Sequence, residues 1–313
     1  MSELVHVAVA IILNKNKEVL ISLRAKDTHQ GGLWEFPGGK LEKSESVSDA
    51  LNREIYEELN ISISKTSSFK KIKFHYTDKS VLLDVWLVES FTGEPEGAEG
   101  QQIKWQAIND LRAEDFPAAN RFIINSLQLP DKYMITGSYA DITDFSLTLE
   151  ASLKNGISLV QLRCKKSSKE EYKKLADRAI SLCKSYNAKL LLNTSEKLFS
   201  SLNVDGLHLT SKMLNSIHER PISDNALLSV SCHTDDEINK AKQLKADIIL
   251  LSPVKETASH PGVQGIGWEK FQKLSENIES PVYALGGMTI DDIVDAKRYG
   301  AQGVAAITDF WGK

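Results

Sequence analysis

Cysteine is scarce in this sequence, neither sign of charge dominates it, and it contains no long apolar stretch. Three of the 313 residues are cysteine and no two form a CxxC pair, which argues against a disulfide framework and against a cysteine-based zinc site. With 38 basic and 42 acidic residues the formal charge is −4, so nothing points to a nucleic-acid polymer as partner. A reduced, cytoplasmic setting is expected.

The longest apolar run near the start, residues 7–13, is far too short to span a bilayer, so no membrane partner is expected. It lacks the charged beginning and the cleavage site of a signal peptide, and we interpret it as a buried strand. Hydrophobic residues make up 42% of the chain and charged residues 26%, which is ordinary globular usage and excludes a disordered protein. At roughly 150 residues per domain, the length predicts two domains.

Two patterns of secondary structure follow one another along the chain. The first combines several strands with few helices and predicts an α+β domain over residues 1–130. Its strands are expected at 5–13, 19–24, 69–76 and 81–89, a strong helix at 46–59 and a closing helix at 116–127.

After residue 130, short apolar runs alternate with helical patterns. Strands are expected at 133–136, 159–163, 189–193, 206–209, 227–231, 248–252, 282–285 and 303–307. Helices between them include 169–184, 235–245, 268–277 and 290–299. Eight strand–helix units predict a compact (β/α)8 TIM barrel over residues 131–313, with little room for a helix after Ile307.

The sharpest chemical signal is a group of three glutamates on the helix expected at 46–59. Glu54, Glu57 and Glu58 stand at positions i, i+3 and i+4, so they share one helix face and repel one another. A Mg²⁺ ion would explain the arrangement, because it takes oxygen ligands and is held together with substrate phosphates. The alternative is a solvated acidic helix face.

Residues around the glutamates extend this signal. Arg53 can pair with a neighbouring carboxylate, and Gly38 and Gly39 let the backbone approach a metal or phosphate closely. With Glu45 they complete the pattern Gly, five residues, Glu, seven residues, Arg-Glu-apolar-any-Glu-Glu, which resembles the Nudix box. The box has glycine where this chain has Asn60, and asparagine is the next-best residue for a left-handed helix stop.

The resemblance extends over residues 4–129. Residues 33–40, 93–101 and 115–120 look like the MutT branch, whose members hydrolyse 8-oxo-dGTP to the monophosphate and pyrophosphate. The resemblance implies a nucleoside triphosphate substrate and Mg²⁺ as cofactor, with Mn²⁺ as an alternative. It assigns catalytic or metal-binding roles to Gly38, Arg53, Glu54, Glu57, Glu58 and Glu99. It assigns nucleotide contacts to Arg24, Phe36, Gly38, Gly39 and Asn120.

Asn120 also suits the oxidised base on chemical grounds. The 8-oxo form of guanine carries a hydrogen on N7 and so presents an acceptor beside a donor, which an amide side chain can match. Ordinary guanine would leave the amide oxygen facing a lone pair. The alternative role for Asn120 is a helix N-cap, because an apolar run follows it. Tyr76 and Lys79 stand where the family tends to place other aromatic and basic residues.

In the second domain, polar and glycine residues gather at predicted strand ends. Arg163 and Lys165 follow the second strand, alternate onto one side and could meet a pyrophosphate. A phosphate site built from the last two strand–helix loops is a recurring feature of such barrels. The candidate ligand residues are Gln161, Arg163, Lys165, Gly286, Gly287, Gly303, Ile307 and Thr308. The alternatives are turn glycines and surface charges.

Residues 132–311 resemble thiamine phosphate synthase and its TenI relatives. Members of that family carry acidic residues after the third and fourth strands to hold Mg²⁺, where this chain has Thr194 and Ser211. We therefore expect a phosphate pocket for a thiamine-related ligand without synthase activity, because the condensation needs charge neutralisation by metal. The alternative is a bifunctional thiamine-pathway protein, with an active barrel and a Nudix half acting on a thiamine-related diphosphate.

Overall fold

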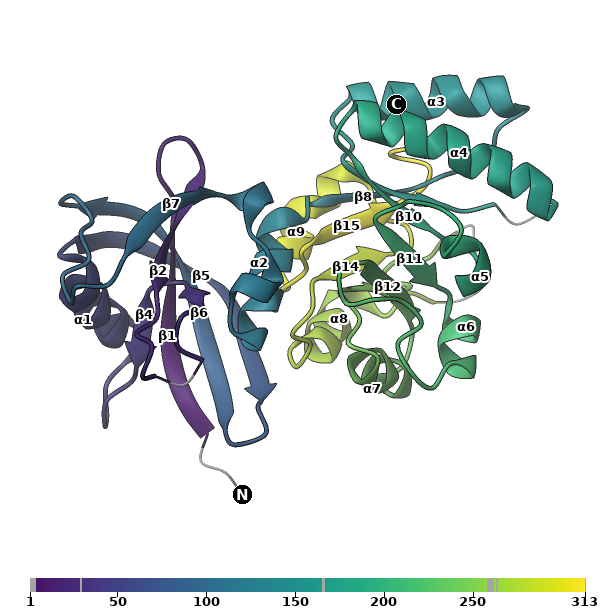
Figure 1. The fold of residues 1–313 in the computed structure, drawn as a ribbon. Coiled ribbons are helices and arrows are strands. Elements are labelled where there is room, and N and C mark those ends of the chain that lie inside the picture. The colour runs from purple at the N-terminus through teal and green to yellow at the C-terminus, as the bar shows by residue number, and fades with distance from the viewer. Residues whose placement is uncertain (1–3, 29, 165–166, 258–261, 263, 313) are drawn as a thin grey trace. The chain divides into compact units, whose positions relative to one another are not determined.

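A computed structural model describes the chain except for residues 1–3, 29, 165–166, 258–261, 263 and 313. It divides into two compact units, one of residues 1–128 and one of residues 129–313 (Figure 1). Across the part of the chain that the structure describes, no helix is long and apolar enough to cross a membrane.

The first unit consists of two small sheets with one long helix. A four-stranded sheet has the order β4-β1-β6-β5, and a three-stranded sheet has the order β3-β2-β7. In chain order the elements are β1 (Leu4–Ile12), β2 (Glu18–Leu23), β3 (Trp34–Glu35), β4 (Gly38–Lys40), α1 (Val47–Leu59), β5 (Ser62–His75), β6 (Ser80–Thr92), β7 (Ile103–Ala107) and α2 (Arg121–Gln128). Since β1 runs parallel to β6 and antiparallel to β4, the sheet is mixed, and the predicted α+β class is confirmed.

The second half of strand β1, residues 8–12, is buried on both faces, which explains why this part of its sequence is entirely apolar. Val9 and Ile11 belong to one hydrophobic cluster of this unit. Ala8, Ala10 and Ile12 belong to another, which also contains the buried face of α1. The strand therefore separates two small cores.

Strands β3, β4 and β7 were not predicted, and two predicted elements of the first unit begin at other residues than expected. The closing helix begins at Arg121, because Pro117 precedes a 3-10 turn, η3 (Ala118–Asn120), that comes before α2. Strand β5 starts seven residues earlier than predicted, at Ser62. Its first half is rich in serine and contains Lys65, so the apolar pattern does not detect it, and such polar residues suit an edge strand.

The second unit is a closed barrel of eight parallel strands, as predicted. The strands are β8 (Lys132–Ile135), β9 (Leu159–Leu162), β10 (Lys189–Leu192), β11 (Gly206–Leu209), β12 (Leu227–Cys232), β13 (Ile248–Leu251), β14 (Val282–Leu285) and β15 (Gly303–Ala306). The helices are α3 (Ile142–Lys154), α4 (Lys169–Ser185), α5 (Glu196–Phe199), α6 (Ser211–Ser216), α7 (Asp235–Gln243), α8 (Gly267–Ser275) and α9 (Ile293–Arg298), which the 3-10 turn η4 (Ile290–Asp292) precedes. Within the described residues, turns rather than a helix follow β15.

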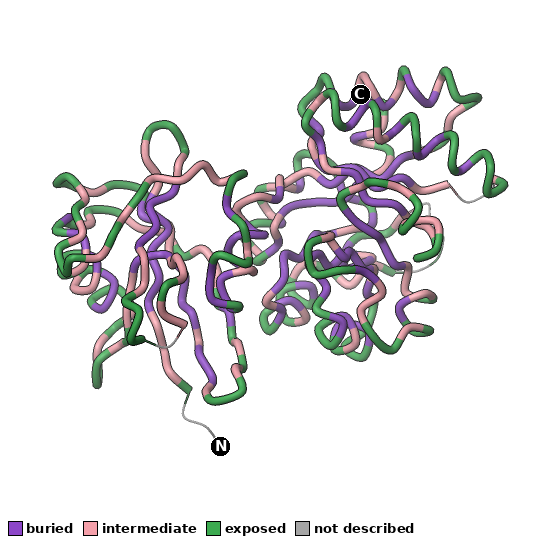
Figure 2. The backbone as a smooth tube through the Cα atoms, viewed as in Figure 1, coloured by how far each residue is buried: buried purple, intermediate pink, exposed green. Residues whose placement is uncertain are grey.

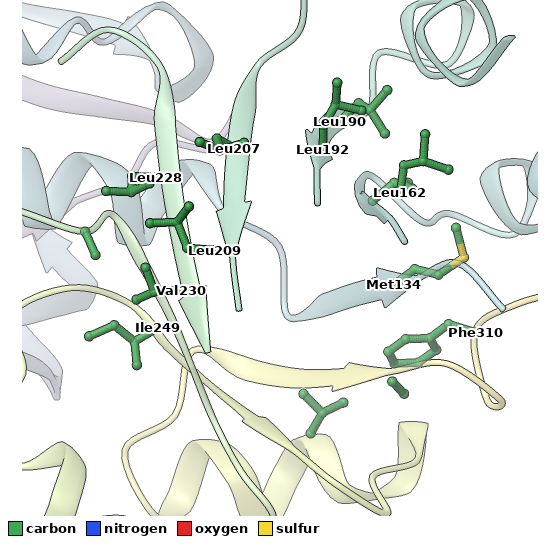
Figure 3. Close-up of a cluster of buried hydrophobic side chains, with 14 of the residues drawn as sticks. Met134, Leu162, Leu190, Leu192, Leu207, Leu209, Leu228, Val230, Ile249 and Phe310 are labelled. Atoms are coloured by element: carbon green, nitrogen blue, oxygen red, sulfur yellow. The ribbon is translucent and has the colours of Figure 1, made fainter. Parts of the chain in front are cut away.

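Side chains on the barrel strands alternate between two cores. Tyr133, Leu250 and Tyr283 belong to the cluster inside the barrel. Residues that alternate with them pack between the strands and the helices, as Figure 3 shows for Leu190 and Leu192 of β10. The strands are consequently buried almost throughout, in contrast to the exposed outer turns of the helices (Figure 2).

Candidate active site and barrel mouth

Helix α1 is fixed at both ends by local hydrogen bonds. At its start the side chain of Ser46 accepts a hydrogen bond from the Asp49 N–H at 3.2 Å. At its end Asn60 adopts a left-handed conformation, with φ of 54°, and its N–H donates to the Tyr56 carbonyl. The Asn60 departure from the Nudix pattern therefore preserves the helix stop, and the acidic positions of α1 keep their direction.

The two glycines of β4 lie directly against the carboxylates of α1. A Cβ atom on Gly39 would come within 2.0 Å of Cδ of Glu54, so only glycine leaves room for this carboxylate. Gly38 has φ of 142°, a conformation that favours glycine, and its N–H donates to Glu58 at 3.2 Å. The close approach predicted from the sequence is thus made to carboxylates of the chain itself.

Arg53 organises the acidic side chains around it. Its guanidinium donates two hydrogen bonds to Glu45, at 2.9 and 2.8 Å, and one to Glu54 at 2.7 Å. A longer contact of 3.4 Å reaches Glu57, and another donor reaches the Lys40 carbonyl. Hydrogen bonding to Arg53 lowers the pKa of Glu45 to about 2, which keeps this carboxylate charged. The predicted pairing of Arg53 with a neighbouring carboxylate is confirmed.

Glu58 occupies the most desolvated position in the cluster. Burial raises its pKa to about 8, and the negative charges of Glu35, Glu54 and Glu99 add to this, whereas the Gly38 N–H opposes it. Burial also raises the pKa of Glu35, despite the opposing charge of Arg24. Several carboxylates therefore share a small, poorly hydrated region.

No three His, Cys, Asp or Glu side chains among the described residues converge closely enough to hold a metal ion. Glu54 accepts a hydrogen bond from Arg53, and Glu58 accepts one from the Gly38 N–H. The Glu57 side chain is 55% exposed, and Glu99 lies in an exposed turn. The donor set still fits a hard cation, because all its side-chain donors are carboxylate oxygens and two of them lie at Gly38-Gly39.

The remaining proposed nucleotide residues, Arg24, Phe36 and Asn120, lie outside β4. Arg24 forms an ion pair with Glu35 of β3. Phe36 is 3% exposed and stacks on Phe116, with ring centroids 5.6 Å apart. Asn120 is 7% exposed and ends the 3-10 turn η3 instead of capping α2 from an extended conformation. This position disfavours the N-cap alternative.

A buried hydrogen-bonded chain crosses the barrel interior. The Tyr133 hydroxyl donates to Ser229 Oγ at 3.2 Å. His208 lies between two serines, with Nδ1 2.9 Å from Ser229 Oγ and Nε2 3.1 Å from Ser231 Oγ. Because Ser229 accepts from Tyr133, its own hydrogen can go to Nδ1, which leaves Nε2 to donate to Ser231. Burial, aided by the charge of Arg163, lowers the pKa of His208 to about 3, so the ring is neutral.

Most candidate ligand residues of the barrel lie at or near the carboxyl ends of the strands. Gln161 is 1% exposed, and its Oε1 has no hydrogen-bond partner among the described residues. Arg163 follows β9, and burial lowers its pKa. Gly286 and Gly287 follow β14 with φ of 97° and 66°, and Ile307 and Thr308 follow β15. Lys165 lies outside the described residues.

Gly303 does not join this group. It is the first residue of β15, at the amino end of the strand, whereas the other candidates gather at the carboxyl ends. A Cβ atom on Gly303 would come within 2.0 Å of the Asp131 carbonyl oxygen, so glycine is needed there for strand packing. The assignment of Gly303 to a ligand site does not fit this position.

Comparisons with known proteins agree with both halves of this description. Residues 8–126 match the family model of the NUDIX domain, and residues 132–310 match that of thiamine monophosphate synthase. The chain is 42% identical to the 8-oxo-dGTP diphosphatase of Escherichia coli over 39% of its own length and 95% of that protein. It is 36% identical to the putative thiamine-phosphate synthase 2 of Aquifex aeolicus over 59% of its own length and 99% of that protein. The chain belongs to both families.

The first unit is a Nudix hydrolase, and the second has the thiamine phosphate synthase fold. At the mouth of the synthase-type barrel, Ser211 donates a hydrogen bond to Glu237, which also accepts from the His233 N–H at 2.6 Å. Glu237 is only 9% exposed, so an acidic side chain lies directly beside Ser211 in a poorly solvated position.

Glu35 and, in the barrel, His208 escaped the sequence analysis as site components, and the contact that ties Tyr76 to Ala119 was not predicted. Glu35 and Tyr76 touch candidate nucleotide residues or their neighbours, and His208 fills the barrel interior. An acidic residue two positions before Pro37 was the available signal for Glu35. For Tyr76 and His208 the decisive contacts span 43 and 21 residues, and no local pattern reports them.

Proposed function

We propose that the Nudix unit hydrolyses 8-oxo-dGTP to 8-oxo-dGMP and pyrophosphate in a Mg²⁺-dependent reaction and so removes an oxidised nucleotide before it enters DNA. The observation that carries this proposal is the close packing of Glu54 and Glu58 on Gly38-Gly39. We also propose residues 1–130 and 131–313 as the two functional domains.

In the proposed reaction each side chain has a defined task. Glu54, Glu57, Glu58, Glu99 and the Gly38 backbone would hold Mg²⁺, which offsets the charge of the phosphates when bound. Arg53 holds Glu54 at 2.7 Å and keeps its carboxylate directed toward the cluster. One of the carboxylates accepts the proton of the water that attacks a phosphorus atom.

Recognition of the nucleotide is assigned to three residues outside the acidic cluster. Arg24 would contact the phosphates, and Phe36 would pack against the nucleotide. Asn120 would pair its amide with the oxygen and the N7 hydrogen of the oxidised base.

The test is hydrolysis by the Glu54→Gln variant at saturating Mg²⁺, with pyrophosphate release measured. Loss of this carboxylate should lower kcat by about 10²–10⁴-fold, because it removes a base or a metal ligand. Thermal unfolding should change little, since the substitution relieves repulsion among like charges. Retention of more than about a tenth of wild-type turnover would remove Glu54 from the proposed machinery.

For the barrel we propose a phosphate-ligand module that binds a thiamine-related phosphate without joining the two thiamine precursors. Two observations support this proposal. Ser211 and Thr194 stand where the resemblance implies acidic residues, and Gly286 and Gly287 have positive φ after β14, where a phosphate would bind. Backbone N–H groups and a cation suffice to hold a phosphate. Metal-assisted departure of pyrophosphate would require the missing carboxylates.

The barrel proposal is tested on the full chain that carries Glu54→Gln, so that the Nudix unit does not consume diphosphate substrates. Binding of a thiazole phosphate is expected by calorimetry, without formation of thiamine phosphate when the pyrimidine diphosphate and Mg²⁺ are added. Turnover near about 1 s⁻¹, an ordinary enzymatic value, would instead support the bifunctional alternative. Absence of binding would leave the barrel without a ligand role.

A further inference from the structure

Tyr76 connects the end of β5 to the turn that carries Asn120. Its N–H donates to the Lys79 carbonyl at 2.8 Å and closes the connection to β6. Its hydroxyl accepts a hydrogen bond from the Ala119 N–H at 3.3 Å, although the two residues are 43 positions apart. The Tyr76 hydroxyl thus reaches the backbone immediately before the proposed base-recognition residue.

Aromatic packing holds the same segment from its other side. The Tyr76 ring lies edge-on to Phe74, with centroids 4.7 Å apart. Phe74 in turn packs on Phe122 of α2 at 6.2 Å. Residues 119 and 122 are therefore both tied to the end of β5, and Asn120 lies between these two attachment points.

We propose that Tyr76 is a specificity-determining positioning residue that fixes the orientation of the Asn120 amide toward the oxidised base. This inference rests on the proposed function of the Nudix unit. Asn120 must present its oxygen and its nitrogen to two adjacent base atoms, and hydrogen bonds weaken steeply when their angles depart from linearity. A 3-10 turn has poor hydrogen-bond geometry of its own, so an external acceptor at Ala119 restricts the tilt of Asn120.

Tyr76 acts through Asn120 and not on the reacting phosphates. The substitution Tyr76→Phe removes the acceptor oxygen and leaves the ring contact with Phe74. Tyr56→Phe is the matched control, because Tyr56 is 58% exposed on the outer side of α1. Both variants lose one hydroxyl, but only Tyr76→Phe loses the contact to the turn that carries Asn120.

The experiment compares kcat/KM for 8-oxo-dGTP and dGTP in the full chain. The wild-type ratio alone tests the proposed function, and a ratio near one would overturn both that function and this inference. With a selective wild type, Tyr76→Phe should lower the ratio about 3- to 10-fold through KM for the oxidised nucleotide, the range of one weakened hydrogen bond. The Tyr56→Phe ratio should not change.

A double-mutant cycle shows whether Tyr76 works through Asn120. In an Asn120→Ala background, Tyr76→Phe should lower the ratio no further. An additional loss there, an equal loss for both nucleotides, or an unchanged ratio in the single variant would each overturn the inference. Amide hydrogen exchange supplies the structural readout, since Ala119 should exchange faster in Tyr76→Phe than in the wild type. Unchanged exchange would also overturn it.

Discussion

The guanidinium of Arg24 and the carboxylate of Glu35 form an ion pair in which only 23% and 22% of the two side chains are exposed. Glu35 also contributes negative charge to the environment of Glu58. One carboxylate therefore lies between a cation proposed to meet the nucleotide and the cluster proposed to hold the metal. Its position suggests that Glu35 prepares Arg24 for the substrate.

Removal of Glu35 should weaken nucleotide binding. Glu35→Ala leaves Arg24 without its partner, and the freed arginine must be ordered at each binding event, which should raise KM about 3- to 10-fold. Glu35→Gln keeps an acceptor oxygen and should have a smaller effect. Steady-state kinetics at saturating Mg²⁺ give the answer. A lower KM in Glu35→Gln would mean that repulsion between Glu35 and the phosphates outweighs the positioning of Arg24.

Alanine at position 39 should lower turnover while the fold survives. Its Cβ atom would displace the Glu54 carboxylate, and that group is the movable end of a side chain, not backbone. A displacement of about 1 Å in a catalytic group can cost on the order of 10²-fold in rate. Gly39→Ala in a Glu54→Gln background should add almost nothing. A large additional loss there would point to damage elsewhere, which thermal unfolding would reveal.

The barrel should lose stability in mild acid through His208. Its folded pKa of about 3 lies below the ordinary value of 6.5, so between these values the folded barrel binds fewer protons than the unfolded chain. The stabilisation is full above pH 6.5 and falls as the pH drops toward 3. From pH 7 to pH 5 the wild type should lose about 2 kcal/mol more than His208→Gln. Calorimetry of both proteins at the two pH values measures the difference, and parallel curves would contradict it.

The sequence predicted the barrel well because its strands are buried on both sides. Each reads as a short apolar run between polar segments, and all eight were recognised on that basis. Helices α5 and α6, with four and six residues, are too short to show a helical period. Helix α3 escaped because serine and threonine interrupt its apolar face.

At the sites, the sequence succeeded where chemistry is local and failed where it depends on contacts between distant segments. Glu54 and Glu58 stand out because a single helix turn brings them together. Glu35 becomes informative only after β2 and β3 pair and bring it to Arg24. The predicted strand 303–307 already begins at Gly303, so its place at the amino end of β15 could have been deduced from the sequence.

The two-faced burial of β1 has a consequence for the fidelity of the proposed enzyme. Ala8 and Ala10 share a core with α1, which carries the carboxylates, whereas Val9 and Ile11 share a core with Phe36 and Phe116 beside the base pocket. Fraying of this one strand would dismantle both cores together. A molecule damaged in this way would lose hydrolysis and base recognition together. It would not persist as an unselective enzyme that hydrolyses intact dGTP.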